Sequence, residues 1–229
     1  MKQLTQNAIK KAVGENASNL VEDGMLVGLG TGSTIFFFIE SLIQRCRAGL
    51  KITAIATSLR SMEQAKKGGI PLYDMDRVSQ IDLTVDGADE IDIQNRMVKG
   101  GGGALAREKI LASSSKKMVV IVDESKVVPV LGKFGVPIEI MPFCYLTTLA
   151  KIRKEGFDGK MRYTPEGHLY STDNGNYIFD INTPLEFPDP ESAHNKLSIL
   201  PGVVETGFFF NLPVQLLIGH KDGSIETRC

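Results

Sequence analysis

Short apolar runs alternate with helical patterns over the first half of the chain. The runs at 25–29, 52–56, 81–85 and 118–122 have the length of buried strands, and 70–73 is a further short candidate. Apolar residues recur at helical spacing over 3–22, from 35 to about 49, from 59 to about 67 and over 104–115. Strands that alternate with helices form a parallel sheet. This half therefore predicts an α/β, Rossmann-like fold: a mostly parallel sheet with helices on both faces.

The pattern changes after residue 132. Strands are expected at 136–141, 160–164, 177–181 and 202–208, and helices at 143–154 and 190–200. Their order, β-α-β-β-α-β, is that of the split βαβ, ferredoxin-like unit. The apolar run 214–218 is expected to return to the main sheet. We therefore predict a catalytic domain over 1–132, completed by 209–229, and a smaller α+β domain over 133–208.

Polar and small residues follow each expected strand of the parallel sheet. The strand ends carry GTGST at 30–34, Thr57–Ser58, DGADE at 86–90 and DESK at 123–126. In open α/β sheets, ligands bind outside the carboxyl ends of the strands. These four segments are therefore expected to converge on one crevice.

The segment GTGST follows a strand and opens a helix, so it can cradle a phosphate. Free N–H groups, hydroxyls and the positive end of the helix dipole would hold the anion. The alternative is a tight turn with Ser33 or Thr34 as N-cap. Ser33 stands where a dinucleotide site needs its third glycine, no acid stands at Thr57–Ser58, and no GxxxxGK[ST] segment occurs. A single phosphate, as on a sugar, fits better than a nucleotide.

The segment DGADEID at 86–92 carries four acids in seven residues. It can be a solvated loop with an Asx turn, a site for Mg²⁺ or Mn²⁺, or a proton-transfer site. Like charges placed close together raise the pKa of at least one carboxyl, which suits acid–base work. These residue types alone leave the metal and proton hypotheses open.

Two lysines accompany the predicted anion site. Lys99 precedes four consecutive glycines, and Lys126 follows Asp123-Glu-Ser at another strand end. A single lysine is usually a solvated surface group. Beside a glycine-rich helix start, it more often faces an anion, so both lysines are candidates for contact with an anionic ligand.

Glu108 lies on an apolar helix face. Its helical neighbours one turn before and after are Ala104, Leu105, Leu111 and Ala112. Burial on such a face is expected to raise the pKa of the carboxyl toward neutrality, as a general base for a carbon acid requires. The alternative is a buried glutamate paired with Arg107 or with a lysine.

Composition narrows the choice of partners. The chain has 229 residues, 42% of them hydrophobic, and a net charge of −1, so no general attraction to nucleic acid or anionic membranes is expected. The odd number of three cysteines, without a C-x-x-C, speaks against a disulfide framework or a zinc site. No signal-peptide pattern and no apolar run of about 20 residues occurs, so a cytoplasmic location is expected. His168, His194 and His220 lie at no expected strand end and are interpreted as surface residues.

Taken together, the motifs resemble those of ribose-5-phosphate isomerases of the A type. The matching segments are GLGTGST, DGADEID, KGGGGALAREK, DESK, LGKF, TDNGN and LPGVVETGFF, in this order. The resemblance implies interconversion of ribose 5-phosphate and ribulose 5-phosphate through a cis-enediol, in the non-oxidative branch of the pentose phosphate pathway. It implies no metal, no organic cofactor, and a homodimer. Two alternatives are a sugar-phosphate sensor and a metal-dependent hydrolase.

The resemblance also assigns roles to residues. It makes Glu108 the general base, and Asp86, Asp89 and Lys99 the groups that move protons between O1 and O2 and stabilise the oxyanion. The substrate-binding residues that it implies are Thr31, Gly32, Ser33, Thr34, Asp86, Gly87, Ala88, Asp89, Lys99, Gly100, Gly101, Gly102 and Lys126. The chain departs from the family pattern at Glu124, at 134–140 and at 57–62.

Overall fold

The computed structural model describes residues 3–74, 77–78, 80–212 and 214–228, so Cys229 lies outside the described residues. The chain forms two compact units. Unit 1 comprises Met1–Ala88, Arg107–Lys126 and Leu212–Cys229, and unit 2 comprises Asp89–Ala106 and Val127–Asn211. These units divide the chain at other points than the expected domain limits, which remain a prediction.

Unit 1 is built on a six-stranded sheet with the order β13-β12-β6-β3-β1-β2. Neighbouring strands are parallel except for the edge pair β12–β13. The strands are β1 (Leu26–Leu29), β2 (Thr53–Ala56), β3 (Ile81–Asp86), β6 (Ser115–Asp123), β12 (Val214–Gly219) and β13 (Ile225–Arg228). The expected mostly parallel sheet and the return of 214–218 are confirmed.

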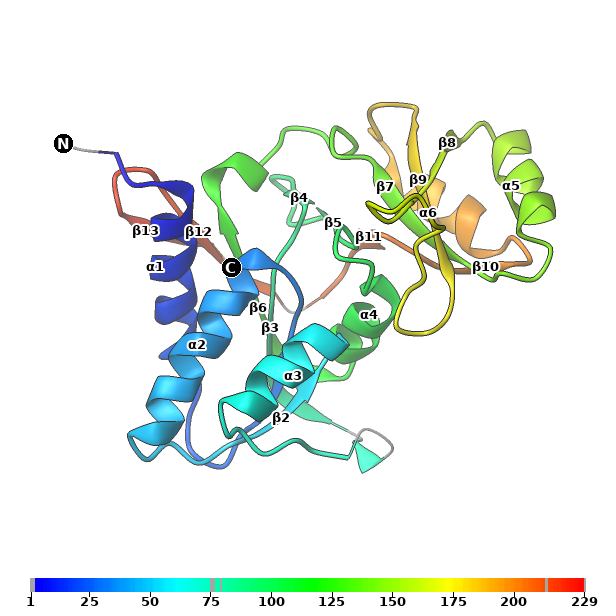
Figure 1. Cartoon of the computed structure of the whole chain (residues 1–229). Coiled ribbons are helices and arrows are strands. Elements are labelled where there is room, and N and C mark those ends of the chain that lie inside the picture. The colour runs from blue at the N-terminus through cyan, green and yellow to red at the C-terminus, as the bar shows by residue number, and fades with distance from the viewer. Residues whose placement is uncertain (1–2, 75–76, 79, 213, 229) are drawn as a thin grey trace. The chain divides into compact units, whose positions relative to one another are not determined.

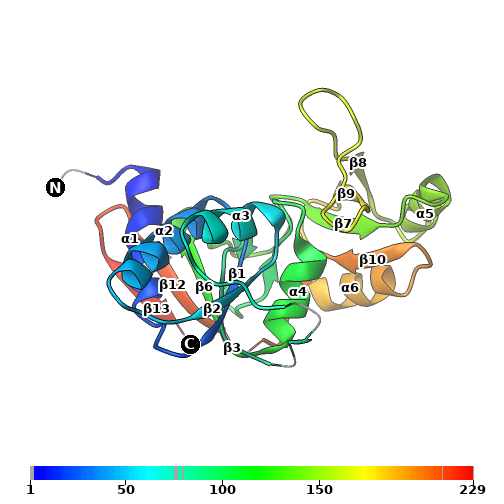
Figure 2. The same cartoon turned by 60° about the horizontal axis from the view of Figure 1, so that its bottom comes forward.

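Helices cover both faces of this sheet (Figures 1 and 2). The helices α1 (Gln6–Ser18), α2 (Ser33–Arg47) and α3 (Leu59–Lys67) share one apolar core with the strands. On the opposite face, Leu111 of α4 (Leu105–Ser113) packs with Ile55 and Ile81. Burial on both faces explains why the strands read as continuous apolar runs instead of alternating ones. The run expected at 70–73 is only a bridge, between Ala54 and Leu72.

Unit 2 contains an antiparallel four-stranded sheet with the order β10-β7-β9-β8. Its elements are β7 (Val136–Ile140), α5 (Tyr145–Lys154), β8 (Asp158–Met161), β9 (Tyr177–Thr183), α6 (Pro190–Ser198) and β10 (Val203–Thr206). The expected β-α-β-β-α-β order is confirmed. Ile138 and Phe179 form a core with Leu149 of α5 and Leu197 of α6, so the helices cover one face of the sheet.

A second sheet of unit 2, with the order β11-β5-β4, was not expected from the sequence. Its strands are β4 (Glu90–Ile91), β5 (Met97–Val98) and β11 (Phe208–Phe209). The single strand expected at 202–208 is therefore wrong: β10 and β11 belong to different sheets. Gly207 joins them, because its N–H donates to the Pro137 carbonyl at 2.7 Å and its carbonyl accepts from the Lys99 N–H at 2.8 Å.

No helix among the described residues is long and apolar enough to cross a membrane.

Substitution of Gly207 tests the packing at this junction. A Cβ there would lie 2.5 Å from the Lys99 carbonyl oxygen and 2.9 Å from that of Pro137, both backbone atoms. We expect Gly207→Ala to lower the free energy of unfolding by about 1–3 kcal/mol, the usual range for overpacking. Gly87→Ala is the control, because its Cβ would lie 3.8 Å from the nearest atom. Equal urea midpoints for the two variants would contradict the close packing of Gly207.

Candidate active site

The strands β1 and β3 are neighbours at the point where the strand order of unit 1 reverses. The chain passes from β1 through α2 to β2 on one side, whereas β3 pairs with the other side of β1. Such switch points are the usual ligand sites of open α/β sheets. Two of the segments predicted for substrate binding lie here: Thr31–Thr34 comes after β1, and Asp86–Ala88 begins at the last residue of β3.

Asp86 connects the ends of these two strands. Its side chain is fully buried, and Oδ1 accepts hydrogen bonds from the Thr31 N–H at 3.0 Å and the Gly87 N–H at 2.7 Å. A Cβ on Gly30 would lie 2.0 Å from the same oxygen, so only glycine permits this approach. Of the predicted residues, the structure therefore brings Thr31, Asp86 and Gly87 together.

The N-terminus of α2 has no side-chain cap. Its N-cap is Gly32, with φ of 122°, and Ser33 is the first helical residue. The alternative that Ser33 or Thr34 serves as N-cap is therefore wrong. The first N–H groups of a helix lack intrahelical partners and carry the positive end of the dipole, so this end is suited to an anion.

Lys10 adds a positive charge at this helix end. It lies on α1, and its Nζ donates to the Ser33 Oγ at 2.9 Å. Sequence analysis did not identify this residue. Its contact joins positions 23 residues apart, which no local pattern reveals. Without that contact, a lysine on an amphipathic helix is interpreted as a solvated group.

The end of β2 supports the same region. The hydroxyls of Thr57 and Thr31 lie 2.7 Å apart, and the Ser61 hydroxyl donates to the Gly30 carbonyl at 2.7 Å. Ser58 is the N-cap of α3. The polar residues after β2 therefore hold the segment after β1 in place.

The acid cluster divides into two pairs with different surroundings. In unit 2, Glu90 accepts from the N–H groups of Gly132 and Phe134, each at 2.6 Å, which explains the LGKF segment. Asp92 accepts from the Gln94 and Arg96 N–H groups and from the Arg96 Nε. Glu90 and Asp92 thus fix local structure, whereas Asp86 and Asp89 remain the candidates for chemistry. Among the described residues, no group of His, Cys, Asp or Glu is arranged to hold a metal ion.

In unit 2, Asp89 and the glycine segment lie together. Asp89 Oδ2 accepts from the Gly101 N–H at 2.7 Å. Lys99 follows β5, is 2% exposed, and places its Nζ 5.4 Å from the centre of the Phe209 ring. Burial of a lysine is costly unless polar groups or a ligand stabilise its charge, so a surface role for Lys99 is excluded.

Glu108 lies in the first turn of α4 and is 3% exposed. Its four apolar helical neighbours, Ala104, Leu105, Leu111 and Ala112, are also buried. The burial expected from the sequence is confirmed.

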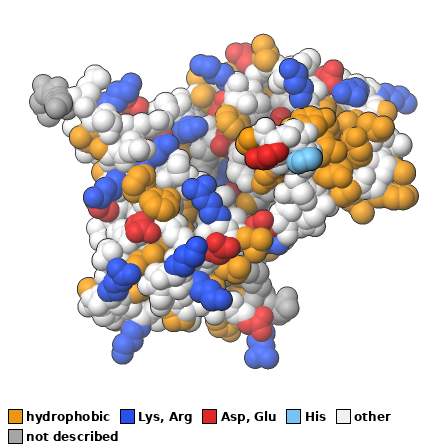
Figure 3. Space-filling view, viewed as in Figure 1, with side chains coloured by type: hydrophobic (Ala, Val, Ile, Leu, Met, Phe, Trp, Pro, Cys, Tyr) orange, Lys and Arg blue, Asp and Glu red, His pale blue; other side chains and the backbone are white. Residues whose placement is uncertain are grey.

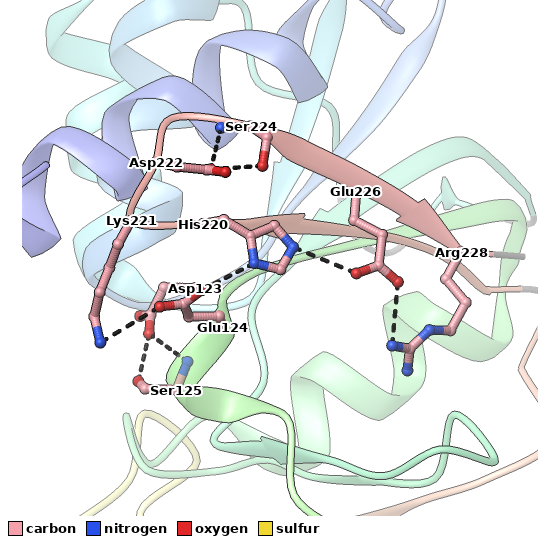
Figure 4. A network of polar contacts seen from close by, with 9 residues as sticks. All are labelled: Asp123, Glu124, Ser125, His220, Lys221, Asp222, Ser224, Glu226 and Arg228. Atoms are coloured by element: carbon pink, nitrogen blue, oxygen red, sulfur yellow. Dashed lines mark hydrogen bonds and ion pairs between the residues drawn. The ribbon is translucent and has the colours of Figure 1, made fainter. Parts of the chain in front are cut away.

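Lys126 ends a short 3₁₀ helix, η2 (Glu124–Lys126), which directly follows β6. A polar network joins η2 to the β12–β13 hairpin (Figure 4). His220 Nδ1 lies 2.9 Å from Glu124 Oε2, and Lys221 Nζ lies 3.4 Å from Glu124 Oε1. His220 directly follows β12, so the expectation that no histidine lies at a strand end is wrong. Glu124, at which the chain departs from the family pattern, therefore has a structural role.

Comparisons with known proteins identify the family. The family model described as ribose 5-phosphate isomerase A (phosphoriboisomerase A) matches residues 53–223. A ribose-5-phosphate isomerase A of Protochlamydia amoebophila is 53% identical over 214 residues, which cover 93% of this chain and 92% of that protein. The chain belongs to the ribose 5-phosphate isomerase A family.

Solved structures agree with this assignment. The ribose 5-phosphate isomerase of Plasmodium falciparum has a TM-score of 0.93 at 38% identity and covers 97% of this chain and 98% of its own. A D-ribose-5-phosphate isomerase in complex with phospho-erythronic acid also has a TM-score of 0.93, at 32% identity, and covers 98% of this chain and 99% of its own. The activity of this chain is therefore that of its family, the isomerisation of ribose 5-phosphate to ribulose 5-phosphate.

The network around His220 predicts how stability depends on pH. The hydrogen bond with Glu124 raises the pKa of His220, and the same bond lowers the pKa of Glu124. The stabilisation from the imidazolium is complete below about pH 6.5 and is lost as pH rises through the raised pKa. That from Glu124 is present above about pH 4.5 and is lost as pH falls through its lowered pKa.

We therefore expect His220→Gln to lower the melting temperature more at about pH 5.5 than at about pH 9. His168→Gln, at an exposed histidine, is the control and should show no such difference. Thermal unfolding followed by circular dichroism measures both variants. A loss for His220→Gln that is the same at both pH values would contradict the charged pair.

Proposed function

We propose that this isomerase moves a proton between C2 and C1 of the sugar with Glu108 as the base and without a metal ion. The hydrogen on the carbon next to a carbonyl is a weak acid. Glu108 would take it from C2, leaving a cis-enediol, and would return a proton to C1. The observation that carries this proposal is the burial of a carboxylate on an apolar helix face directly after the glycine segment.

The phosphate end of the substrate would be held in unit 1. The uncapped N-terminus of α2, the hydroxyls of Ser33 and Thr34, and the charges of Lys10 and Lys126 supply the donors for a phosphate dianion. Binding energy at this non-reacting end would orient the sugar for proton transfer.

The oxygens at the reacting end would be served by Asp86, Asp89 and Lys99. The C1 carbonyl oxygen must gain a proton as the enediol forms. The hydroxyl at O2 must lose its proton when the enediol becomes the ketose. Carboxylates can move these protons, and a buried ammonium can stabilise the developing oxyanion. The burial of Asp86 and Lys99 supports this role, because a low local dielectric strengthens such interactions.

We also propose that the enzyme is a cytoplasmic homodimer in the non-oxidative branch of the pentose phosphate pathway. Five exposed apolar side chains of unit 2 support self-association: Met141, Phe143, Leu146, Ile199 and Val204. Figure 3 shows hydrophobic side chains gathered over the α5 and α6 region. The unpaired thiols of Cys46 and Cys144 are compatible with a reducing compartment.

The metal-free mechanism is tested by activity in the presence of a chelator. We expect conversion of ribose 5-phosphate to the ketose at an unchanged rate in excess EDTA, because no step requires a metal. Colorimetric detection of the ketose measures this rate. Activity that disappears on chelation and returns with Mg²⁺ or Mn²⁺ would refute the metal-free mechanism. Release of inorganic phosphate in place of ketose would indicate a hydrolase.

Glu108→Gln tests the general base. Gln keeps the size and helix propensity of Glu but cannot accept a proton from carbon. We expect a loss of about 10²–10⁴-fold in kcat, the usual contribution of a general base. Glu63→Gln on α3, whose side chain is 64% exposed, is the matched control. A well-folded Glu108→Gln variant that keeps more than about a tenth of kcat would exclude Glu108 as the base.

The homodimer is tested by light scattering of Phe143→Asp. Phe143 is 80% exposed, so a charge there is tolerated in a free chain but not in an apolar interface. We expect the wild-type protein to have twice the mass of one chain and Phe143→Asp to approach the mass of one chain. Leu185→Asp, at a side chain that is 70% exposed and precedes α6, should remain dimeric. A wild-type mass of one chain at micromolar concentration would refute the homodimer.

A further inference from the structure

Arg162 of unit 2 forms a close ion pair with Asp180. Arg162 directly follows β8, and its N–H donates to the Ile178 carbonyl of β9 at 2.9 Å. Its Nε donates to Asp180 Oδ2 at 2.9 Å, and its Nη2 donates to Oδ1 of the same carboxylate. Such a two-point pairing fixes the plane of the guanidinium as well as its position.

The third nitrogen of this guanidinium, Nη1, reaches the glycine segment. Nη1 donates to the carbonyl oxygens of Gly100, at 3.0 Å, and Gly101, at 3.1 Å. Tyr170, whose ring lies 5.7 Å from the guanidinium carbon, donates its hydroxyl to the next carbonyl, that of Gly102, at 3.2 Å. Three consecutive carbonyls of the segment are thus bound by two neighbouring side chains.

Binding of these carbonyls determines where the N–H groups of the segment point. In a planar trans peptide, the C=O and the following N–H point in opposite directions. The Gly100 carbonyl held by Arg162 therefore directs the Gly101 N–H away from Arg162, and this N–H donates to Asp89 Oδ2 at 2.7 Å. The Gly101 carbonyl directs the Gly102 N–H in the same way. The Gly100–Gly101 peptide group thus bonds to Arg162 at one end and to the Asp89 carboxylate at the other.

The glycines make this arrangement possible but do not maintain it. A Cβ on Gly101 would lie 2.5 Å from Asp89 Oδ1, and one on Gly103 would lie 2.3 Å from the Tyr170 hydroxyl. Glycine loses more conformational entropy on ordering than any other residue. A run of four glycines therefore needs bonds to other parts of the unit in order to keep one conformation.

We propose that Arg162, oriented by Asp180, is a positioning residue for the isomerisation. It holds the peptide groups of Gly100–Gly102, and through the Gly101 N–H it holds Asp89, in the orientation that the substrate oxygens require. This role rests on the proposed function of Asp89 and the glycine segment. Arg162 itself takes no part in proton transfer.

Arg162→Met tests the proposal, because Met keeps much of the side-chain length and removes every donor. We expect kcat/KM per folded molecule to fall about 10- to 100-fold, with changes in both kcat and KM, since displaced catalytic groups slow the reaction by such factors. Arg153→Met is the matched control. Arg153 pairs with Asp158 of the same unit at 2.8 Å and is 50% exposed, and its removal should change kcat/KM less than twofold.

Two further variants separate positioning from a general loss of structure. Arg162→Lys keeps one charge that can reach a carbonyl, so it should recover part of the activity lost in Arg162→Met. Asp180→Asn weakens the pairing that orients the guanidinium and should lower kcat/KM in the same direction by a smaller factor. These two variants decide the question if Arg162→Met does not fold.

The outcomes distinguish this proposal from the function on which it rests. If Arg162 is merely structural, Arg162→Met will lower the melting temperature and the folded fraction and leave the KM of the folded protein unchanged. That result overturns the proposal, and so do normal kinetics of folded Arg162→Met. Inactive wild-type enzyme would refute the proposed function. Wild-type activity of Asp89→Asn would remove the role of Asp89 and therefore that of Arg162.

Discussion

A single buried carboxylate joins the two strand ends on which the geometry of unit 1 depends. Asp86 accepts hydrogen bonds from the Thr31 and Gly87 N–H groups at the point where the strand order reverses. It fits there because Gly30 has no side chain. The segment after β1 is thereby held at the start of α2, which leaves the N-terminus of that helix uncapped. A buried carboxylate is stable only with such donors, so this one group serves both the fold and the proposed chemistry.

The need of a carboxylate for hydrogen-bond donors also distinguishes the acids of the cluster at 86–92 from one another. Glu90 and Asp92 use their oxygens to accept from backbone N–H groups of unit 2, so they stabilise loops that lie outside the predicted substrate-binding segments. Asp89 accepts from the Gly101 N–H, which ties it to the glycine segment. Clustered acids in a sequence therefore give no count of catalytic groups. Asp86 and Asp89 also accept from backbone N–H groups, but their donors belong to the segments predicted to bind substrate, so the identity of the donors separates the two pairs.

Much of the fold follows from local periodicity. The alternating strands and helices of unit 1 and the β-α-β-β-α-β order of unit 2 were predicted, because apolar spacing reports directly which face of an element is buried. The short strands β4, β5 and β11 were missed, since two residues carry no periodicity. The strand expected at 202–208 was wrong for a related reason: the bonds of Gly207 to Pro137 and Lys99, distant in sequence, divide it.

The residues of the candidate site likewise fall into those that the sequence identified and those that it missed. Glu108 was identified because its apolar neighbours lie within one helical turn, and the glycine segment because four glycines are rare in ordered structure. Lys10 and Arg162 were missed, since their contacts join residues 23 and about 60 positions apart. Sequence patterns thus located the groups proposed for the chemistry. The residues that position those groups required the three-dimensional structure.

The central claim, proton transfer by Glu108, is tested most directly by isomerisation of ribose 5-phosphate in D₂O. A carboxylate that takes a proton from C2 exchanges part of it with solvent before returning it to C1. We therefore expect the ribulose 5-phosphate to carry deuterium at C1, detected by NMR, at a rate that falls with kcat in Glu108→Gln. Ketose formed at the full rate with no deuterium at C1 would contradict transfer through a carboxylate that exchanges its proton with solvent. Deuterium incorporated at the wild-type rate by folded Glu108→Gln would contradict the assignment of the base.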